Sequence, residues 1–113
     1  MGLLDKLRRR VRPELIEIEI DVIDQIILKH LIRHQTAPAL DLVQEVLMAR
    51  RTANEQQVRL SLIRLESLRL IARDSAPQLE VDNRGREYAI TSDGKRLRKV
   101  LQTVPTSRIQ TYL

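Results

Sequence analysis

The sequence has no cysteine, no phenylalanine and no tryptophan, and tyrosine occurs only at Tyr88 and Tyr112. The absence of cysteine excludes disulfides, thiol catalysis, cysteine-ligated zinc fingers and iron–sulfur clusters. Because aromatic residues make up only 2% of the chain, it lacks the stacking platforms of RNA-recognition sheets and oligonucleotide-binding barrels. The core must therefore be built from leucine, isoleucine and valine.

Glycine is also scarce, and Gly2, Gly85 and Gly94 are too far apart to form a phosphate-binding loop. Serine, histidine and aspartate form no nucleophile motif, so we expect no enzymatic activity and no cofactor. The two histidines, His30 and His34, are four residues apart and could share a metal ion. The chain has no third histidine and no cysteine to complete such a site, so we expect a solvated helix face and no metal.

Long apolar runs are absent as well. No run approaches the roughly 20 residues that are needed to cross a bilayer. The first residues include neither a long apolar segment nor a small-residue cleavage site, so they do not resemble a signal peptide. We therefore expect a cytoplasmic protein without a membrane span.

The chain is rich in aliphatic residues and in positive charge. Its 113 residues suit one domain, and 42% hydrophobic with 31% charged residues is a globular balance. The net charge of +5 indicates an anionic partner. The first 13 residues are basic and an acidic run follows over 14–24. We divide the chain into a basic N-terminal arm (1–13), a domain (14–104) and a C-terminal tail (105–113).

The first part of the domain predicts an extended segment and two helices. Residues 15–20 alternate apolar and acidic side chains, which favours an arm or short strand, although they could instead extend the next helix. From Asp21, the expected N-cap with Asp24 in the first turn, apolar residues recur every three to four positions and predict a helix of about three turns. Pro38 interrupts the pattern. A short second helix is marked by Leu40, Val43 and Leu47.

A third helix is predicted over about 53–68, and Thr52 and Glu55 match the capping-box spacing at its start. Because Gly85 tolerates a positive φ, residues 83–86 suit a hairpin turn. The remaining elements are a strand at 70–73, hairpin arms at 79–82 and 87–90, and a last helix that opens at 91–94, carries Leu97, Val100 and Leu101 and ends by Pro105.

This order predicts a mainly α fold with a small antiparallel β wing (α+β). Three helices closed by a two- or three-stranded wing form the core of a winged helix-turn-helix, here with an added C-terminal helix. Residues 58–71, which include Arg-Leu-Glu-Ser-Leu-Arg-Leu-Ile, look like the recognition helix and first wing strand of small winged-helix repressors.

Residues 88–97, Tyr-Ala-Ile-Thr-Ser-Asp-Gly-Lys-Arg-Leu, resemble the Tyr-x-Leu-Thr-x-x-Gly-x-x-Leu stretch of MarR-like and PadR-like regulators. There, the second wing strand runs into the C-terminal helix. These families usually place glycine just before the first wing strand, where this chain has Arg69. The resemblance implies a dimeric, sequence-specific DNA-binding transcription regulator.

In such a regulator the third helix would lie in the major groove, and the wing (79–90) would contact the DNA backbone or minor groove. At about 100° per residue, Val58, Leu62 and Leu65 face the core. The opposite face carries Gln56, Leu60, Ile63 and Ser67. Glutamine suits adenine, arginine suits guanine or phosphate, and apolar side chains suit the thymine methyl. The candidate nucleic-acid contacts are Arg50, Arg51, Thr52, Asn54, Gln56, Gln57, Arg59, Arg64, Arg84 and Arg86.

Leu60 and Ile63 also suit a protein contact, so the alternative function is a protein–protein interaction module on this surface. The carboxylates of 14–24 are expected on a solvated face. The amphipathic pattern over 3–11 fits a membrane-surface anchor, a DNA-gripping arm, a dimer brace or a frayed terminus. The expected partners are double-stranded DNA and a second copy of the chain, which would bind through the N-terminal segment and the C-terminal helix.

Overall fold

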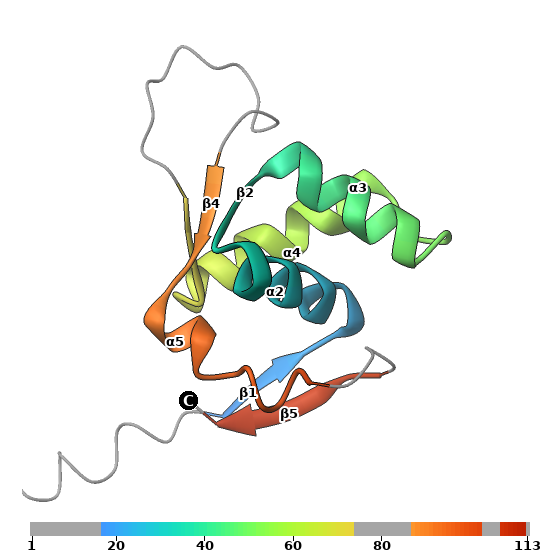
Figure 1. Ribbon diagram of the computed structural model, residues 1–113. Coiled ribbons are helices and arrows are strands. Elements are labelled where there is room, and N and C mark those ends of the chain that lie inside the picture. The colour runs from blue at the N-terminus through green and yellow to red at the C-terminus, as the bar shows by residue number, and fades with distance from the viewer. Residues whose placement is uncertain (1–16, 74–86, 103–106, 113) are drawn as a thin grey trace, which may run out of the picture.

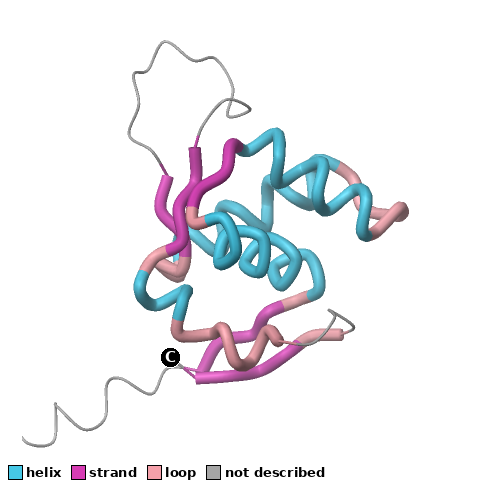
Figure 2. Tube along the Cα trace, viewed as in Figure 1, coloured by secondary structure: helices cyan, strands magenta, loops and turns pink. Residues whose placement is uncertain are grey.

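The computed structural model describes residues 17–73, 87–102 and 107–112 (Figures 1 and 2). Its elements are β1 (Glu17–Ile20), α2 (Val22–His34), β2 (Thr36–Pro38), α3 (Ala39–Ala49), α4 (Glu55–Ser67), β3 (Ile71–Arg73), β4 (Glu87–Ile90), α5 (Ser92–Lys95) and β5 (Ile109–Tyr112). Figure 2 shows the strands in two groups, one beside the helices at the upper left and one below them. This architecture is the predicted α+β class, with three helices followed by paired wing strands.

The helices α2, α3 and α4 pack around one aliphatic core. Leu31 of α2, Val46 of α3, and Val58 and Leu65 of α4 are each 0% exposed. Burying one such side chain stabilises the fold by about 1.5–3 kcal/mol. Leu62 is buried too, so the predicted core face of the third helix is confirmed.

Helix α2 begins at the predicted N-cap. The Asp21 Oδ1 accepts a hydrogen bond of 2.8 Å from the backbone N–H of Asp24, and the Asp24 Oδ2 accepts one of 3.1 Å from the backbone N–H of Asp21. These reciprocal bonds satisfy two backbone donors that the first helical turn would otherwise leave unpaired.

Helix α4 has a different N-cap from the one predicted. The Asn54 Oδ1 accepts a 2.9 Å hydrogen bond from the backbone N–H of Gln57, and the Gln57 Oε1 accepts a 3.0 Å bond from that of Asn54. The predicted capping box of Thr52 and Glu55 is therefore wrong. Its spacing fits the motif, but the chain enters helical geometry two residues later.

Helix α4 ends at a residue in the left-handed region, Arg69, with φ of 63°. The N–H of Leu70 donates to the carbonyl of Leu65 at 3.0 Å, and the N–H of Arg69 donates to the carbonyl of Glu66 at 2.9 Å. Together these bonds form a Schellman cap, in which glycine is the favoured residue because a side chain costs about 1–2 kcal/mol there. Backbone geometry thus makes glycine better suited than arginine to this position.

The wing sheet has the strand order β2-β4-β3, and both pairs are antiparallel. The predicted strands at the positions of β3 and β4 are confirmed, and they pair with Ile71 opposite Ile90. The predicted arm at 79–82 lies outside the described residues, but its predicted pairing with 87–90 is wrong, because β2 and β3 occupy both edges of β4. Strand β2 was not predicted. Pro38 favours an extended residue before it, and pairing with β4 turns that local preference into a strand.

Helix α5 is only one turn long, so the predicted last helix is too long. The chain continues through turns, and Leu97 and Leu101 are still buried. Gly94 is needed for close packing, because a Cβ on it would lie 2.3 Å from the carbonyl oxygen of Leu70. This contact joins α5 to the residue that precedes the wing.

Strands β1 and β5 form a two-stranded antiparallel ribbon below the helices (Figure 1). Ile18 and Ile20 of β1 are buried between exposed glutamates, and Ile20 lies opposite Ile109. The extended interpretation of this segment is confirmed, and the helical alternative is wrong. The sequence predicts no secondary structure in the tail after Pro105, where the structure forms β5. The buried side chain of Gln25 on α2 ties it to the core by donating to the carbonyl of Ser107.

Candidate nucleic-acid interface

The face of α4 that points away from the core is open. It carries Gln56, Leu60 and Ile63, and the last two are 55% and 60% exposed. These residues are spaced by four and three positions, so they form one stripe along the helix. The sequence predicted this orientation, because the core-facing residues of the same helix are separated from them by about half a turn.

The turn between α3 and α4 presents positive charge at the N-terminus of α4. Arg50, Arg51 and Thr52 are exposed, and no ion pair of the described residues involves either arginine. The side-chain oxygens of Asn54 and Gln57 accept the capping bonds, which leaves their amide nitrogens as donors. A helix N-terminus with flanking guanidinium groups is a favourable place for phosphate.

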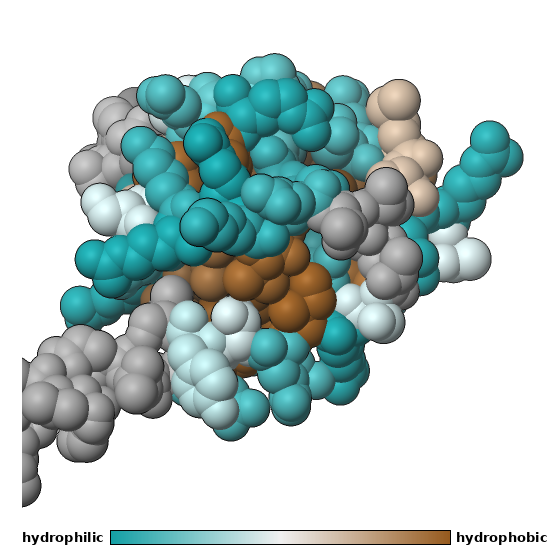
Figure 3. All heavy atoms as spheres, turned by 60° about the horizontal axis from the view of Figure 1, so that its bottom comes forward, coloured by the Kyte–Doolittle hydropathy of each residue, from teal (hydrophilic) through white to brown (hydrophobic). Residues whose placement is uncertain are grey.

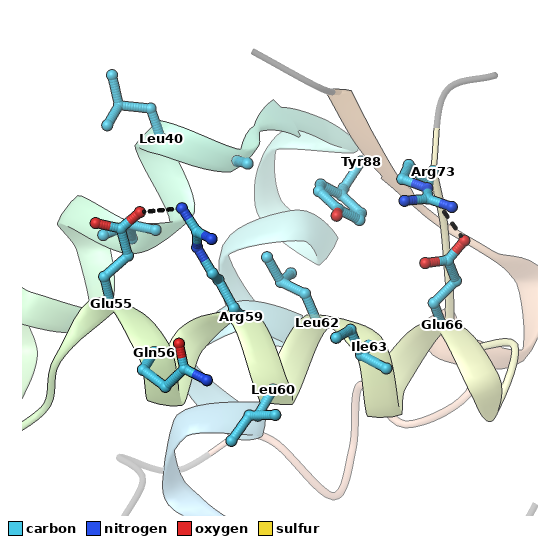
Figure 4. A pocket seen from close by; sticks show the side chains of 12 residues that line it. Leu40, Glu55, Gln56, Arg59, Leu60, Leu62, Ile63, Glu66, Arg73 and Tyr88 are labelled. Atoms are coloured by element: carbon cyan, nitrogen blue, oxygen red, sulfur yellow. Dashed lines mark hydrogen bonds and ion pairs between the residues drawn. The ribbon is translucent and has the colours of Figure 1, made fainter. Parts of the chain in front are cut away.

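A groove of about 260 Å³ runs between the start of α3, the exposed side of α4 and the wing strands (Figure 4). Leu40, Leu60 and Ile63 supply exposed apolar surface. Twelve residues line the groove: Ala39, Leu40, Val43, Glu55, Gln56, Arg59, Leu60, Leu62, Ile63, Glu66, Arg73 and Tyr88.

The charges in the groove cancel. The Arg59 Nη2 lies 2.9 Å from the Glu55 Oε2, and the Arg73 Nε lies 3.5 Å from the Glu66 Oε2. All four side chains are at least one-third exposed, so each pair contributes only about 0–1 kcal/mol. The groove is therefore apolar and formally neutral between two partly exposed ion pairs.

Sequence reasoning missed three contributors to this groove. The sequence predicts only that Leu40 belongs to the second helix and that Arg73 and Tyr88 belong to strands. Their proximity to α4 results from the packing of the wing strands beside the helix. No local signal in the sequence shows it.

Arg64 is held by two carboxylates at the N-terminus of α2. Its Nη2 lies 2.9 Å from the Asp21 Oδ2 and also donates to the Asp24 Oδ2, while the Ser61 hydroxyl donates to the Asp24 Oδ1. Asp24 is only 1% exposed. The expectation of a solvated face is thus wrong for this carboxylate, and Arg64 joins α4 to α2.

Burial affects the two carboxylates differently. Burial raises the pKa of Asp24 above its ordinary value, and the hydrogen bonds from Arg64 and Ser61 offset only part of this effect. Burial also acts to raise the pKa of Asp21, but hydrogen bonds from the Asp24 backbone and from Arg64 outweigh it, so the net direction is down. The two carboxylates raise the pKa of Arg64. We expect Arg64 to stay fully charged.

The remaining candidates are two arginines of the predicted hairpin turn and the two histidines of α2. Arg84 and Arg86 lie outside the described residues. His30 and His34 have ring centroids 4.4 Å apart, and the His30 Nδ1 lies 3.6 Å from the Glu45 Oε1. The described ranges contain no group of three or more potential metal ligands. His30 is half-buried rather than solvated. Burial lowers its pKa, and the charge of Glu45 offsets only part of this effect.

No helix within 17–73, 87–102 and 107–112 is long and apolar enough to cross a membrane. No family model matches the chain, and no curated protein matches its sequence.

Among solved structures, the chain is similar to the crystal structure of NadR in complex with 4-hydroxyphenylacetate, with a TM-score of 0.52 and 19% sequence identity. The match covers 89% of this chain and 68% of the NadR chain. NadR is a winged-helix regulator of the MarR family. At this identity the likeness concerns the fold alone, and it supports the winged-helix architecture.

Proposed function

We propose that the protein is a dimeric, sequence-specific DNA-binding transcription regulator. In this proposal α4 lies in the major groove and the wing lies along the backbone or in the minor groove. The observation that carries the proposal is the open face of α4, which stands between a basic turn and the wing strands in a winged-helix fold. The structural likeness to NadR, itself a regulator, adds support.

Phosphate contacts would hold the protein on the duplex. Arg50 and Arg51 are exposed beside the N-terminus of α4, and Thr52 and Asn54 are exposed in the same turn. Phosphate contacts of this kind fix the register of the protein on DNA without reading sequence. Arg84 and Arg86, which the sequence predicts in the hairpin turn and which lie outside the described residues, would supply the second backbone or minor-groove contact.

Base contacts would come from the next turn of α4. Gln56, Gln57 and Arg59 are exposed there. Arg59 reaches DNA only by leaving or sharing its ion pair with Glu55, which is weak because both side chains are partly exposed. Arg64 is not part of this proposal, because two carboxylates already hold it.

A homodimer would match paired half-sites in the operator. Figure 3 shows an apolar patch, surrounded by hydrophilic side chains, on the side of the molecule where β1 and β5 lie. A patch of this kind is a common site of protein association. It supports the proposed dimerisation through the N-terminal segment and the C-terminal helix, which light scattering across protein concentration would test.

The second candidate function is a protein–protein interaction module. It is favoured by the groove along α4, where Leu40, Leu60 and Ile63 are exposed and the charges cancel. A partner with a complementary apolar ridge would fit this surface without any need for DNA.

Fluorescence anisotropy with a random-sequence duplex, titrated across salt, tests the regulator proposal. We expect micromolar binding that weakens steeply as salt rises. Arg51→Ala should weaken binding to all sequences and reduce the magnitude of the salt slope by about one. Arg33→Ala is the matched control, since Arg33 is exposed in the last turn of α2 and belongs neither to the proposed DNA contacts nor to the proposed dimer segments. The absence of binding at low salt would refute the regulator proposal.

The two candidates separate with a double variant, Leu60→Ser with Ile63→Ser. Loss of a captured protein partner with unchanged affinity for random-sequence DNA favours the interaction module. Salt-dependent DNA binding by the wild type without any such partner favours the regulator.

A further inference from the structure

We infer that the middle of α4 recognises A·T base pairs, with Leu60 and Ile63 in contact with thymine methyl groups and Gln56 bonded to adenine. The inference rests on the proposed function. It adds which bases the helix reads and which side chains determine the choice.

The outward stripe of α4 is suited to these two bases. Thymine alone among the four bases presents a methyl group in the major groove, and it is recognised by apolar contact. Leu60 and Ile63 are more than half exposed in the free protein, so a methyl contact would remove apolar surface from water. Adenine presents an acceptor and a donor that a glutamine amide can bond together. Gln56 is exposed one turn before Leu60.

Guanine recognition lacks a free side chain on this helix. Guanine is most often read by an arginine or lysine that reaches its O6 and N7. Helix α4 contains no lysine and two arginines, Arg59 and Arg64. Arg59 is paired with Glu55, and Arg64 is held by two carboxylates of α2. A guanine contact by Arg59 would require it to leave or share its weak ion pair with Glu55, whereas Leu60 and Ile63 are exposed and need no such exchange.

Cytosine is disfavoured for the corresponding reason. Its amino group is read by a glutamate or aspartate, but Glu55 and Glu66 of α4 are paired with arginines. The Ser67 hydroxyl donates within the helix, to the carbonyl of Ile63. A G·C pair opposite Leu60 would therefore leave polar base edges against apolar side chains, which costs the hydrogen bonds those edges made to water.

The test uses two duplexes that differ only in the methyl group. One is an alternating A·T duplex, and the other is the same duplex with every thymine replaced by uracil. We expect the wild type to bind the thymine duplex about fourfold more tightly for each methyl contacted, which corresponds to about 0.8 kcal/mol. Leu60→Ser with Ile63→Ser should remove this preference and leave the salt slope unchanged. Met48→Ser, an exposed apolar residue at the end of α3 (80% exposed), should retain it.

The possible failures are distinct. If the wild type binds neither duplex at low salt, the proposed regulator function is wrong. If it binds both duplexes with the same affinity and a steep salt slope, the regulator function stands and methyl recognition is overturned. A thymine preference that persists in the double variant overturns the assignment to Leu60 and Ile63.

Discussion

Replacing Arg64 with alanine should destabilise the fold through a carboxylate on another helix. Asp24 is 1% exposed and accepts a charge-assisted hydrogen bond from Arg64. Removing one partner of a fully buried ion pair costs about 3–5 kcal/mol. The Arg64 side chain is 46% exposed, and Asp24 would keep its bonds from Ser61 and from the backbone of Asp21. We therefore expect a smaller loss, about 1–3 kcal/mol at pH 7.

The loss should depend on pH, because a buried carboxylate can escape an unfavourable environment by binding a proton. Burial already raises the pKa of Asp24, and removing Arg64 would raise it further. A carboxyl whose folded pKa lies above its unfolded pKa destabilises the fold as pH rises through those values. Asp21, whose pKa Arg64 helps to lower, would lose stabilisation over the same range. The difference in the free energy of unfolding between the wild type and Arg64→Ala should be largest near pH 7 and should decrease toward pH 4.

Urea unfolding of the wild type and the variant at pH 7 and pH 4.5 measures this difference in the free energy of unfolding. Arg59→Ala is the matched control on the same helix, since Arg59 is similarly exposed but pairs with a glutamate that is itself 33% exposed. It should cost no more than about 0.5 kcal/mol at either pH. A deficit for Arg64→Ala below that value at pH 7, or one that does not change with pH, would refute the reasoning.

Three further predictions concern stability. Arg69→Gly should raise the free energy of unfolding by about 1 kcal/mol in urea titrations, because glycine removes the steric strain of a side chain in the left-handed region. A lower stability of this variant would contradict the Schellman geometry. Asn54→Ala should lower the free energy of unfolding by about 1 kcal/mol, while Thr52→Ala should leave it nearly unchanged. The reverse order would show that Thr52 is the N-cap. Because burial lowers the pKa of His30, the free energy of unfolding should fall as pH drops below about 6.5, the unfolded value. His30→Gln should flatten that slope, and an unchanged slope would exclude His30 as its cause.

Much of the secondary structure could be predicted because it depends on neighbours in the chain. The spacing of apolar residues in α2 and α4 is a local property, and so is the cap at Asp21. The same reasoning placed Leu60 and Ile63 on the open face of α4. The prediction of the N-cap at Thr52 failed because two overlapping segments, 52–55 and 54–57, both match the spacing of a capping box. The path of the chain after α3 decides that Asn54 is the N-cap.

The candidate site was predicted in part for the same reason. The stripe on α4 and the basic turn before it are continuous in sequence, so periodicity and charge were enough to find them. Leu40, Arg73 and Tyr88 come from other elements, and only packing brings them to the groove. Arg64 is the clearest case, because as an exposed arginine on the recognition helix it resembles a DNA contact.

The sequence by itself determined the order of the main elements, the apolar sides of α2 and α4, and the exclusion of cysteine and aromatic chemistry. These features follow from residue type and from interactions within one or two turns of chain. The sequence did not determine the apolar side of α3, which buries Ala39, Leu42 and Val46 rather than Leu40. The tertiary structure alone decided that Arg64 meets Asp24, 40 residues away, and that β5 completes a ribbon with β1. Such pairings depend on how the helices pack and on which buried polar groups then find partners. A one-dimensional pattern does not contain that information, because many distant pairs have compatible chemistry and only the folded core brings particular ones together.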